Sequence, residues 1–110
     1  MAQTLPIELC SGQLLSTVPI SLYLAPAAAL VTIRRALFTN IATIPVLLTV
    51  QKVLSNGSII ILVNQQPVSI GEAYVSPALA NLVVQSGEAI RAFTSVASAL
   101  NAFISGFQSQ

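Results

Sequence analysis

The side chains that could do acid–base chemistry are few and far apart in this sequence of 110 residues. Its only carboxylates are Glu8, Glu72 and Glu88, and it contains neither aspartate nor histidine. Hydrolysis by paired carboxylates needs two such groups facing one reacting bond, and this spacing predicts no such pair. The lack of histidine excludes imidazole catalysis and most zinc sites. We therefore expect no catalytic residue and no enzyme activity.

A single cysteine, Cys10, is the only thiol. It can form no disulfide within the chain, and one thiol cannot build a metal cluster. We expect Cys10 to be a small, buried apolar residue. The sequence thus predicts no metal site and no cofactor.

The basic residues are also too few to follow a nucleic-acid backbone, which takes several neutralised phosphates. They are Arg34, Arg35, Lys52 and Arg91. The adjacent arginines could bind an anionic partner or pair with Glu72 or Glu88 of another subunit, or they could be a solvated pair at a strand kink. We expect no nucleic-acid binding.

The composition itself points to association. Hydrophobic residues make up 55% of the chain and charged residues only 6%, with a formal net charge of +1. A typical soluble domain carries roughly a quarter charged residues. So little charge gives an isolated monomer poor protection against sticking, so we expect burial against copies of itself or against other proteins.

A membrane location is the obvious rival, because residues 9–33 carry no charge. Polar residues and prolines interrupt that stretch, however, whereas a spanning helix needs about 20 predominantly apolar residues. The first ten residues have no Lys or Arg for a signal peptide, and Glu8 and Leu9 make a poor lipoprotein site before Cys10. We expect neither targeting nor membrane insertion.

Prolines and glycines recur along the whole chain and divide it into short segments, which is typical of an all-β sandwich or barrel. They are Pro19, Pro26, Pro45, Gly57, Pro67, Gly71, Pro77, Gly87 and Gly106. We predict one small antiparallel β-sandwich over residues 14–110, jelly-roll or immunoglobulin-like, with about eight strands. Residues 1–13 are predicted to form an extended N-terminal arm, because Pro6 and Gly12 discourage a helix there. Leu5, Ile7 and Leu9 of this arm could lay a strand on the sheet edge of a neighbouring protein.

A hairpin is the firmest local prediction. Val46, Leu48 and Val50 alternate with Leu47, Thr49 and Gln51, which is the period of a strand. Asn56–Gly57 then signals a tight turn, and the β-branched run 59–63 returns as the partner strand. The triplet 56–58 is also formally a glycosylation sequon, but a turn is the simpler interpretation.

Two further strands are predicted upstream. Residues 19–26 read as an edge strand bounded by prolines, and residues 30–40 as a longer strand. A bulge at Arg34–Arg35 would turn both arginines outward and keep three apolar side chains of the longer strand in the core. These three are Ile33, Ala36 and Phe38.

Residues 88–107 can be a helix or two strands. Phe93, Val96, Leu100, Phe103 and Phe107 recur at helical spacing among alanines, whereas the serines and Thr94 weaken a helix. In the strand alternative, Ile90, Ala92, Thr94, Ala102 and Ile104 face inward, with a turn at 97–98 and with Asn101, Phe103 and Ser105 outward. In either case Gly106 is expected to end the element. Spacing and propensity alone leave both open.

Short motifs recur in an order similar to that of a family of small virion proteins of tailed bacteriophages. They are Tyr23-x-x-Pro26, Ile33-Arg34 with Phe38-Thr39-Asn40, Val46-x-Leu48-x-Val50, Gly87-Glu88-x-Ile90-Arg91-Ala92, Ala97-Ser98-Ala99 and Asn101-x-x-Ile104-Ser105-Gly106. The resemblance spans residues 14–107 and implies β-sandwich modules, hence strands over 88–107. The chain departs from the family at Glu88, where Asp is commoner, and at Ile41, Ile44 and Pro45, which suggest a covered loop.

This resemblance implies a structural role in the virion: a capsid decoration or cement protein, or a neck or tail subunit. Its partners would be other phage virion proteins and copies of itself. The predicted turn at 86–87 leaves Glu88 and Arg91 at an edge, with Arg91 and Phe93 facing outward. The predicted interface comprises Leu5, Ile7, Leu9, Arg34, Arg35, Leu47, Arg91, Phe93 and Phe103; alternatively, the aromatic faces lie inside the sandwich.

The alternative function is a fibre or receptor-binding module that binds a host glycan. Such a site would be expected to combine exposed aromatic rings with clustered Asp, Asn or Glu. This chain has no Trp and no Asp, and Tyr23 and Tyr74 are far apart in sequence. A structural role is therefore favoured.

Overall fold

The computed structural model describes residues 4–26 and 30–109, and within them every regular element is a β-strand. The strands are β1 (Thr4–Leu14), β2 (Ile20–Leu24), β3 (Leu30–Asn40), β4 (Val46–Val53), β5 (Ile59–Val68), β6 (Ala73–Val75), β7 (Val83–Gln85), β8 (Ala89–Thr94) and β9 (Leu100–Ser109). The all-β prediction is confirmed.

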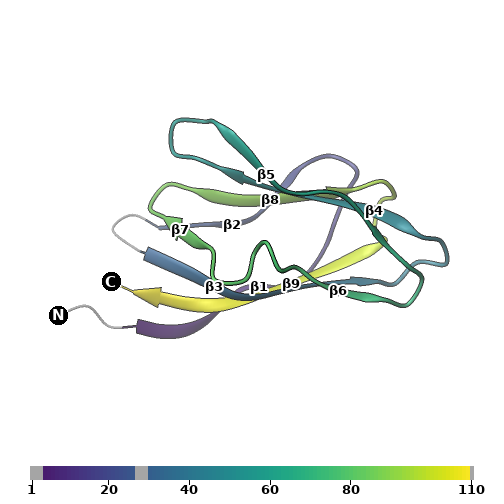
Figure 1. The fold of residues 1–110 in the computed structure, drawn as a ribbon, viewed down its shortest axis with the longest axis horizontal. Coiled ribbons are helices and arrows are strands. Elements are labelled where there is room, and N and C mark those ends of the chain that lie inside the picture. Colours follow the sequence, from purple (N-terminus) through teal and green to yellow (C-terminus); the bar gives the residue numbers. More distant parts are fainter. Residues whose placement is uncertain (1–3, 27–29, 110) are drawn as a thin grey trace.

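The strands form two antiparallel sheets that face each other (Figure 1). Sheet A has the order β1-β9-β3, with β6 and β7 both on the far side of β3, and sheet B has the order β2-β8-β4-β5. The pairs are nested: β1 with β9, β2 with β8, β3 with β6 and β7, and β4 with β5. A long hairpin rolled into two sheets in this way is a jelly roll, which decides between the two sandwiches predicted.

The described residues form nine strands, one more than the eight expected, because the strand position beside β3 is divided into β6 and β7. β7 pairs with Leu30–Thr32 at the start of β3, and β6 pairs with Leu37–Thr39 near its end. Between them the chain leaves the ladder and returns through hydrogen bonds from Ser76 N to Ala36 O and from Asn81 N to Ile33 O. The excursion lies beside the β3 bulge, where regular pairing is already interrupted.

The bulge in β3 is confirmed. Its register against β9 shifts between Ile33 and Arg35, and both Arg34 and Arg35 are exposed. The extra residue changes the alternation so that apolar side chains on both sides of it face sheet B. Ile33, Ala36 and Phe38 are all fully buried.

The β4–β5 hairpin is confirmed as well. Gly57 has φ 89°, and the turn is closed by hydrogen bonds from Leu54 N to Ser58 O and from Gly57 N to Leu54 O. Val46, Leu48 and Val50, which the alternation places on one face, all lie in the core.

Residues 89–109 are strands β8 and β9, which settles the choice that spacing left open. The inward side chains are those predicted for the strand alternative, because Ile90, Ala92, Thr94, Ala102 and Ile104 are buried. Gly106 does not end the element: β9 continues to Ser109. A Cβ at position 106 would lie 2.2 Å from Thr32 O, so the lack of a side chain lets β9 approach β3 closely.

The N-terminal segment, which was expected to be an extended arm, is a strand of the chain's own sheet A. Residues 1–3 lie outside the described residues, and residues 4–14 form β1, which pairs with β9 from Thr4↔Ser109 to Leu14↔Asn101. This segment is therefore the edge strand of its own sheet A instead of reaching toward a neighbour. The apolar partners it finds within the chain explain the difference, since Leu9 and Cys10 are buried.

Candidate partner interface

A hollow on the outer face of sheet B lies among the predicted interface residues Leu47 and Phe93. It has a volume of about 240 Å³ and is open to solvent. Its lining residues are Thr17, Leu47, Thr49, Gln65, Phe93, Thr94 and Ser95. None is charged, so the hollow suits an uncharged group.

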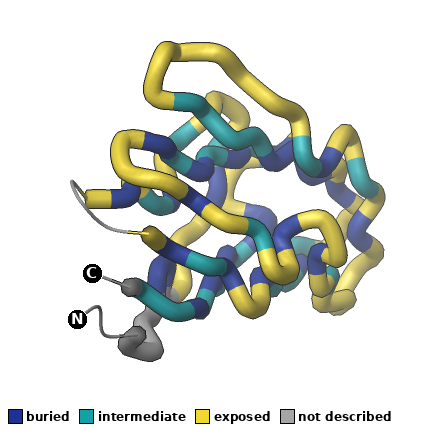
Figure 2. Tube along the Cα trace, turned by 60° about the vertical axis from the view of Figure 1, so that its left-hand side comes forward, coloured by how far each residue is buried: buried dark blue, intermediate teal, exposed yellow. Residues whose placement is uncertain are grey.

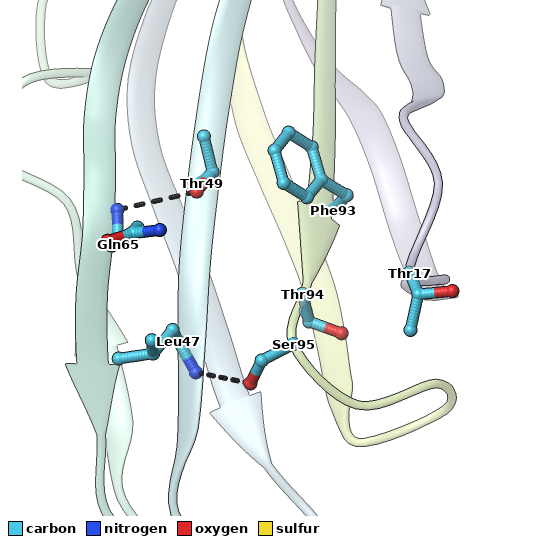
Figure 3. Close-up of a pocket in the computed structure, with 7 residues that line it drawn as sticks. All are labelled: Thr17, Leu47, Thr49, Gln65, Phe93, Thr94 and Ser95. Atoms are coloured by element: carbon cyan, nitrogen blue, oxygen red, sulfur yellow. Dashed lines mark hydrogen bonds between the residues drawn. The ribbon is translucent and has the colours of Figure 1, made fainter.

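Local backbone geometry creates this hollow. Thr49 on β4 lies directly opposite Phe93 on β8, and the two side chains form its floor (Figure 3). On the β5 side, Gln65 has φ 48° and lies where the register against β4 shifts, so β5 bends away there. Gln65 N donates a hydrogen bond to Thr49 Oγ1 at 3.3 Å, which fixes one wall.

Three of the four hydroxyl side chains around the hollow make hydrogen bonds within the chain. Ser95 Oγ accepts a hydrogen bond from Leu47 N at 2.9 Å, and Thr94 Oγ1 donates to Val96 O. Thr49 Oγ1 accepts from Gln65 N. A partner would therefore meet Phe93 and Leu47 chiefly as apolar surface.

Three predicted interface residues lie together on this face. Leu47 is exposed, Phe93 is half-buried and Arg91 is half-buried on the same strand as Phe93. Arg91 Nε donates to Gln51 Oε1 on β4 at 2.6 Å, so its guanidinium is held across the sheet. However, β8 is an inner strand between β2 and β4, so the expectation that Arg91 marks a sheet edge is wrong.

Phe103 and the two adjacent arginines, Arg34 and Arg35, lie on the outer face of sheet A, on the opposite side of the sandwich. Phe103 is half-buried there and lies opposite Leu37 of β3. The Arg34 guanidinium carbon lies 5.7 Å from the centroid of the Phe107 ring, a cation–π distance. Phe103 is thus not a neighbour of Phe93 and Leu47.

The three predicted residues of the N-terminal segment have different outcomes. Leu9 is only 7% exposed and belongs to the core, so it is not presented to a partner, contrary to the prediction. Leu5 pairs with Gln108 and Ile7 with Gly106 in the β1–β9 ladder. The side chains of Leu5 and Ile7 lie outside the described part of the chain.

Glu88 is satisfied within its own chain. It is buried, its carboxylate Oε1 lies 3.1 Å from Lys52 Nζ, and it accepts a hydrogen bond from Gln85 N at 2.9 Å. These contacts, the Gln85 N–H first, lower the pKa of the Glu88 carboxyl below its usual value, although burial works against them. Lys52 Nζ also donates to Val83 O of β7 at 3.1 Å, so the ion pair joins the two sheets.

Glu88 therefore needs no ion pair with Arg34 or Arg35 of another subunit to satisfy its charge. Among the described residues, Lys52–Glu88 is the one salt bridge, and Arg34 and Arg35 are exposed. Arg35 remains a candidate for contact with a partner, whereas Arg34 already covers an aromatic ring.

Sequence reasoning missed several exposed apolar side chains. Val18, Ile41, Ile44 and Ile70 lie exposed in the β1–β2, β3–β4 and β5–β6 connections. The loop at 41–45, which was expected to be covered, is not covered by its own chain. A second group is Ile59, Ile60 and Ile61 on β5. The run of three isoleucines was the available signal, but it was interpreted only as a return strand.

Neither a metal centre nor a membrane helix is seen in the described residues. Over residues 4–26 and 30–109, His, Cys, Asp and Glu form no group of three that could hold an ion. In the same part of the chain no helix is long and apolar enough to cross a membrane.

The nested strand order and the outward apolar faces define a class: a jelly-roll β-sandwich of the kind found in viral capsid and lectin domains. Comparison with solved structures gives the same fold. The chain is similar to the T13 viral particle of infectious bursal disease virus, with TM-score 0.65 and 16% identity over 98% of this chain and 31% of that chain. It is also similar to the structure of the Gx strain of that virus, with TM-score 0.60 and 14% identity over 99% of this chain and 32% of that chain.

A VP2 subviral particle of infectious bursal disease virus is a third similar structure, with TM-score 0.59, 16% identity and 98% of this chain covered. This chain spans about a third of the length of the structures it matches. No protein-family model matches the sequence, and no curated protein matches it significantly. At these identities the likeness establishes the fold alone.

Proposed function

We propose that this chain is a non-enzymatic structural subunit of a virus particle, held there by apolar contacts with copies of itself and with other virion proteins. The observation that carries this proposal is a jelly roll similar to that of a virus particle, together with thirteen exposed large aliphatic side chains in the described part of the chain. Seven charged residues cannot keep such a surface apart from its neighbours.

The proposed contact surfaces are the outer face of sheet B and the loop end of the sandwich. On sheet B, Phe93 and Leu47 offer apolar surface in the lining of the hollow, beside Arg91. At the loop end, the side chain of Asn40 holds the β3–β4 connection by donating to Ile44 O and Val68 O, so that Ile41 and Ile44 are displayed on a fixed loop. Rigid apolar anchors of this kind favour specific association, because little side-chain and backbone freedom is lost on binding.

Within this role, we propose a capsid decoration or cement protein, or a neck or tail subunit, of a tailed bacteriophage. Sequence motifs between Tyr23 and Gly106 support the phage assignment. The similar solved structures come from infectious bursal disease virus and support the capsid-like fold without the phage assignment.

The glycan-binding alternative has one observation in its favour, which is the hollow beside Phe93. Sugar sites usually combine an aromatic ring with clustered carboxylate or amide groups, whereas this lining contains no carboxylate and a single amide side chain, Gln65. Thr49, Thr94 and Ser95 each make one hydrogen bond within the chain. The hollow therefore fits an apolar side chain of a partner protein better than a sugar.

Co-expression with the products of the adjacent genes tests the proposal. Particles would be purified on a density gradient, and the chain would be quantified in each fraction by mass spectrometry. We expect the chain to sediment with particles at a fixed ratio to the major protein. A chain that stays at the top of the gradient with every neighbouring gene product, or that turns over a substrate, would overturn the proposal.

A further inference from the structure

The two sheets have four open edges, and three of them carry features that discourage pairing with another chain. The β1 edge contains Pro6 and two register shifts. The β2 edge is only five residues long and lies between Pro19 and Pro26. The fourth strand position of sheet A is interrupted between β6 and β7, where residues 76–82 leave the ladder. Prolines, bulges and short strands are the usual protection of sheet edges.

The β5 edge is different in its first part. Ile59, Ile60 and Ile61 pair in unbroken register with Val53, Lys52 and Gln51. Their side chains are 48%, 45% and 55% exposed, respectively. Only beyond them do register shifts, the positive φ of Gln65 and Pro67 interrupt the strand. Residues 59–61 are therefore an apolar, regular and unprotected edge.

The hairpin that carries this edge projects from the sandwich. β5 is the outermost strand of sheet B, and its turn extends beyond the neighbouring strands in Figure 1. The tube in Figure 2 shows an exposed stretch over this projecting hairpin, and residues 55–61 are all exposed. Nothing in the described chain covers the outer side of β5.

We propose that residues 59–61 pair antiparallel with the same residues of a second copy of this chain, about a two-fold axis at Ile60. Ile59 of each chain would lie opposite Ile61 of the other, and sheet B would continue from one subunit into the next. This inference rests on the proposed function, because it names one contact through which copies associate.

A second copy is the fitting occupant for two reasons. Residues 53–71 carry no charge, so two identical hairpins can approach without repulsion, and the segment has no charge with which to select a different partner. In addition, the other edges of the described chain are protected, so the matching unprotected edge is β5 itself. Pairing of like with like closes into a two-fold dimer instead of growing into a fibre.

An edge lysine tests the pairing directly. Ile61→Lys would place a charge on the edge, whereas the control Ile70→Lys would place it on an equally exposed isoleucine in the β5–β6 connection. We expect Ile61→Lys to weaken dimerisation by roughly 10–100-fold in sedimentation equilibrium, and Ile70→Lys to leave this contact intact. Circular dichroism would confirm that both variants fold. Equal dimerisation of Ile61→Lys and the parent chain would overturn the inference.

Cysteine cross-linking tests the register in the Cys10→Ala background. At a two-fold axis Ile60→Cys would face its own copy at a Cα separation of about 4.5–5.5 Å, which a disulfide can span. We expect this variant to form covalent dimers under mild oxidation much faster than Val18→Cys, although Val18 is more exposed than Ile60 and lies outside the edge. Equal rates would overturn the inference.

The two proposals can fail separately. A parent chain that enters particles but is a monomer in solution at every concentration overturns the dimer and leaves the structural role standing. Conversely, the parent chain could enter no particle while Ile61→Lys still loses dimerisation. That result would support the dimer and overturn the virion role.

Discussion

Replacing Gly106 with alanine is expected to weaken the central pairing of sheet A. A Cβ at this position would lie 2.2 Å from Thr32 O and 3.1 Å from Ile33 Cα, whereas ordinary contact begins at 3.4 Å. The β3 and β9 backbones must therefore separate locally by about 1.2 Å, the difference between 3.4 and 2.2 Å. Both obstructing atoms belong to the backbone, so no side-chain rotation can relieve the contact.

The cost follows from the ladder that must open. A shift of this size breaks about two inter-strand hydrogen bonds, each worth roughly 1 kcal/mol net, and adds overpacking of about 1–3 kcal/mol. We therefore expect Gly106→Ala to lower the free energy of unfolding by about 3–5 kcal/mol, a large part of the roughly 5–15 kcal/mol typical of a domain. Urea denaturation followed by circular dichroism would measure the change.

Ser105→Ala is the matched control, because it changes the neighbouring residue of the same strand, whose side chain is on the other face. We expect it to change the free energy of unfolding by less than about 0.5 kcal/mol. If Gly106→Ala unfolded at the same urea concentration as the parent chain, the close approach of β9 to β3 would not exist as described.

Three further predictions concern a charge, a loop and two faces. Glu88→Gln should cost about 1–3 kcal/mol at neutral pH. Because the folded-state pKa of Glu88 is lowered, its contribution is present above the ordinary pKa of 4.5 and is lost as the pH falls through the folded value, so urea unfolding of the two proteins should converge at acid pH. Asn40→Ala should cost about 2–4 kcal/mol in the same assay, because it leaves Ile44 O, Val68 O and Ala42 N without their side-chain partner. Phe93→Asp and Phe103→Asp should both fold, since each ring is on an outer face, and should reduce the mass of assemblies in light scattering; unfolding of either variant would contradict its outward placement.

Local alternation made much of the fold predictable. Val46, Leu48 and Val50 alternate strictly and are followed by Asn56–Gly57, so strand, inward face and turn were all encoded within a few neighbouring residues. The bulge at Arg34–Arg35 was predictable for the same reason, because only an extra residue brings apolar side chains on both sides of it to one face.

Properties that depend on distant parts of the chain were not predictable from local patterns. The close approach of Thr32 to Gly106 joins strands that are far apart in sequence, so the glycine was interpreted as a terminator. Likewise, the N-terminal segment was expected to reach a neighbour because its partner strand, β9, is at the other end of the chain. Phe93 and Phe103 were grouped on one surface because alternation says which residues face outward but not from which sheet.

Several charged side chains of this protein are engaged in contacts within the chain. Lys52 and Glu88 bind each other between the sheets, Arg91 is held by Gln51, and Arg34 lies over the Phe107 ring. Charges used in this way stabilise the chain's own structure and contribute little to keeping subunits apart. The charges nearest the exposed isoleucines are Lys52, which pairs with Ile60 and binds Glu88, and Glu72, which lies beside the 41–45 loop. Contact with other subunits would remove these isoleucines from water.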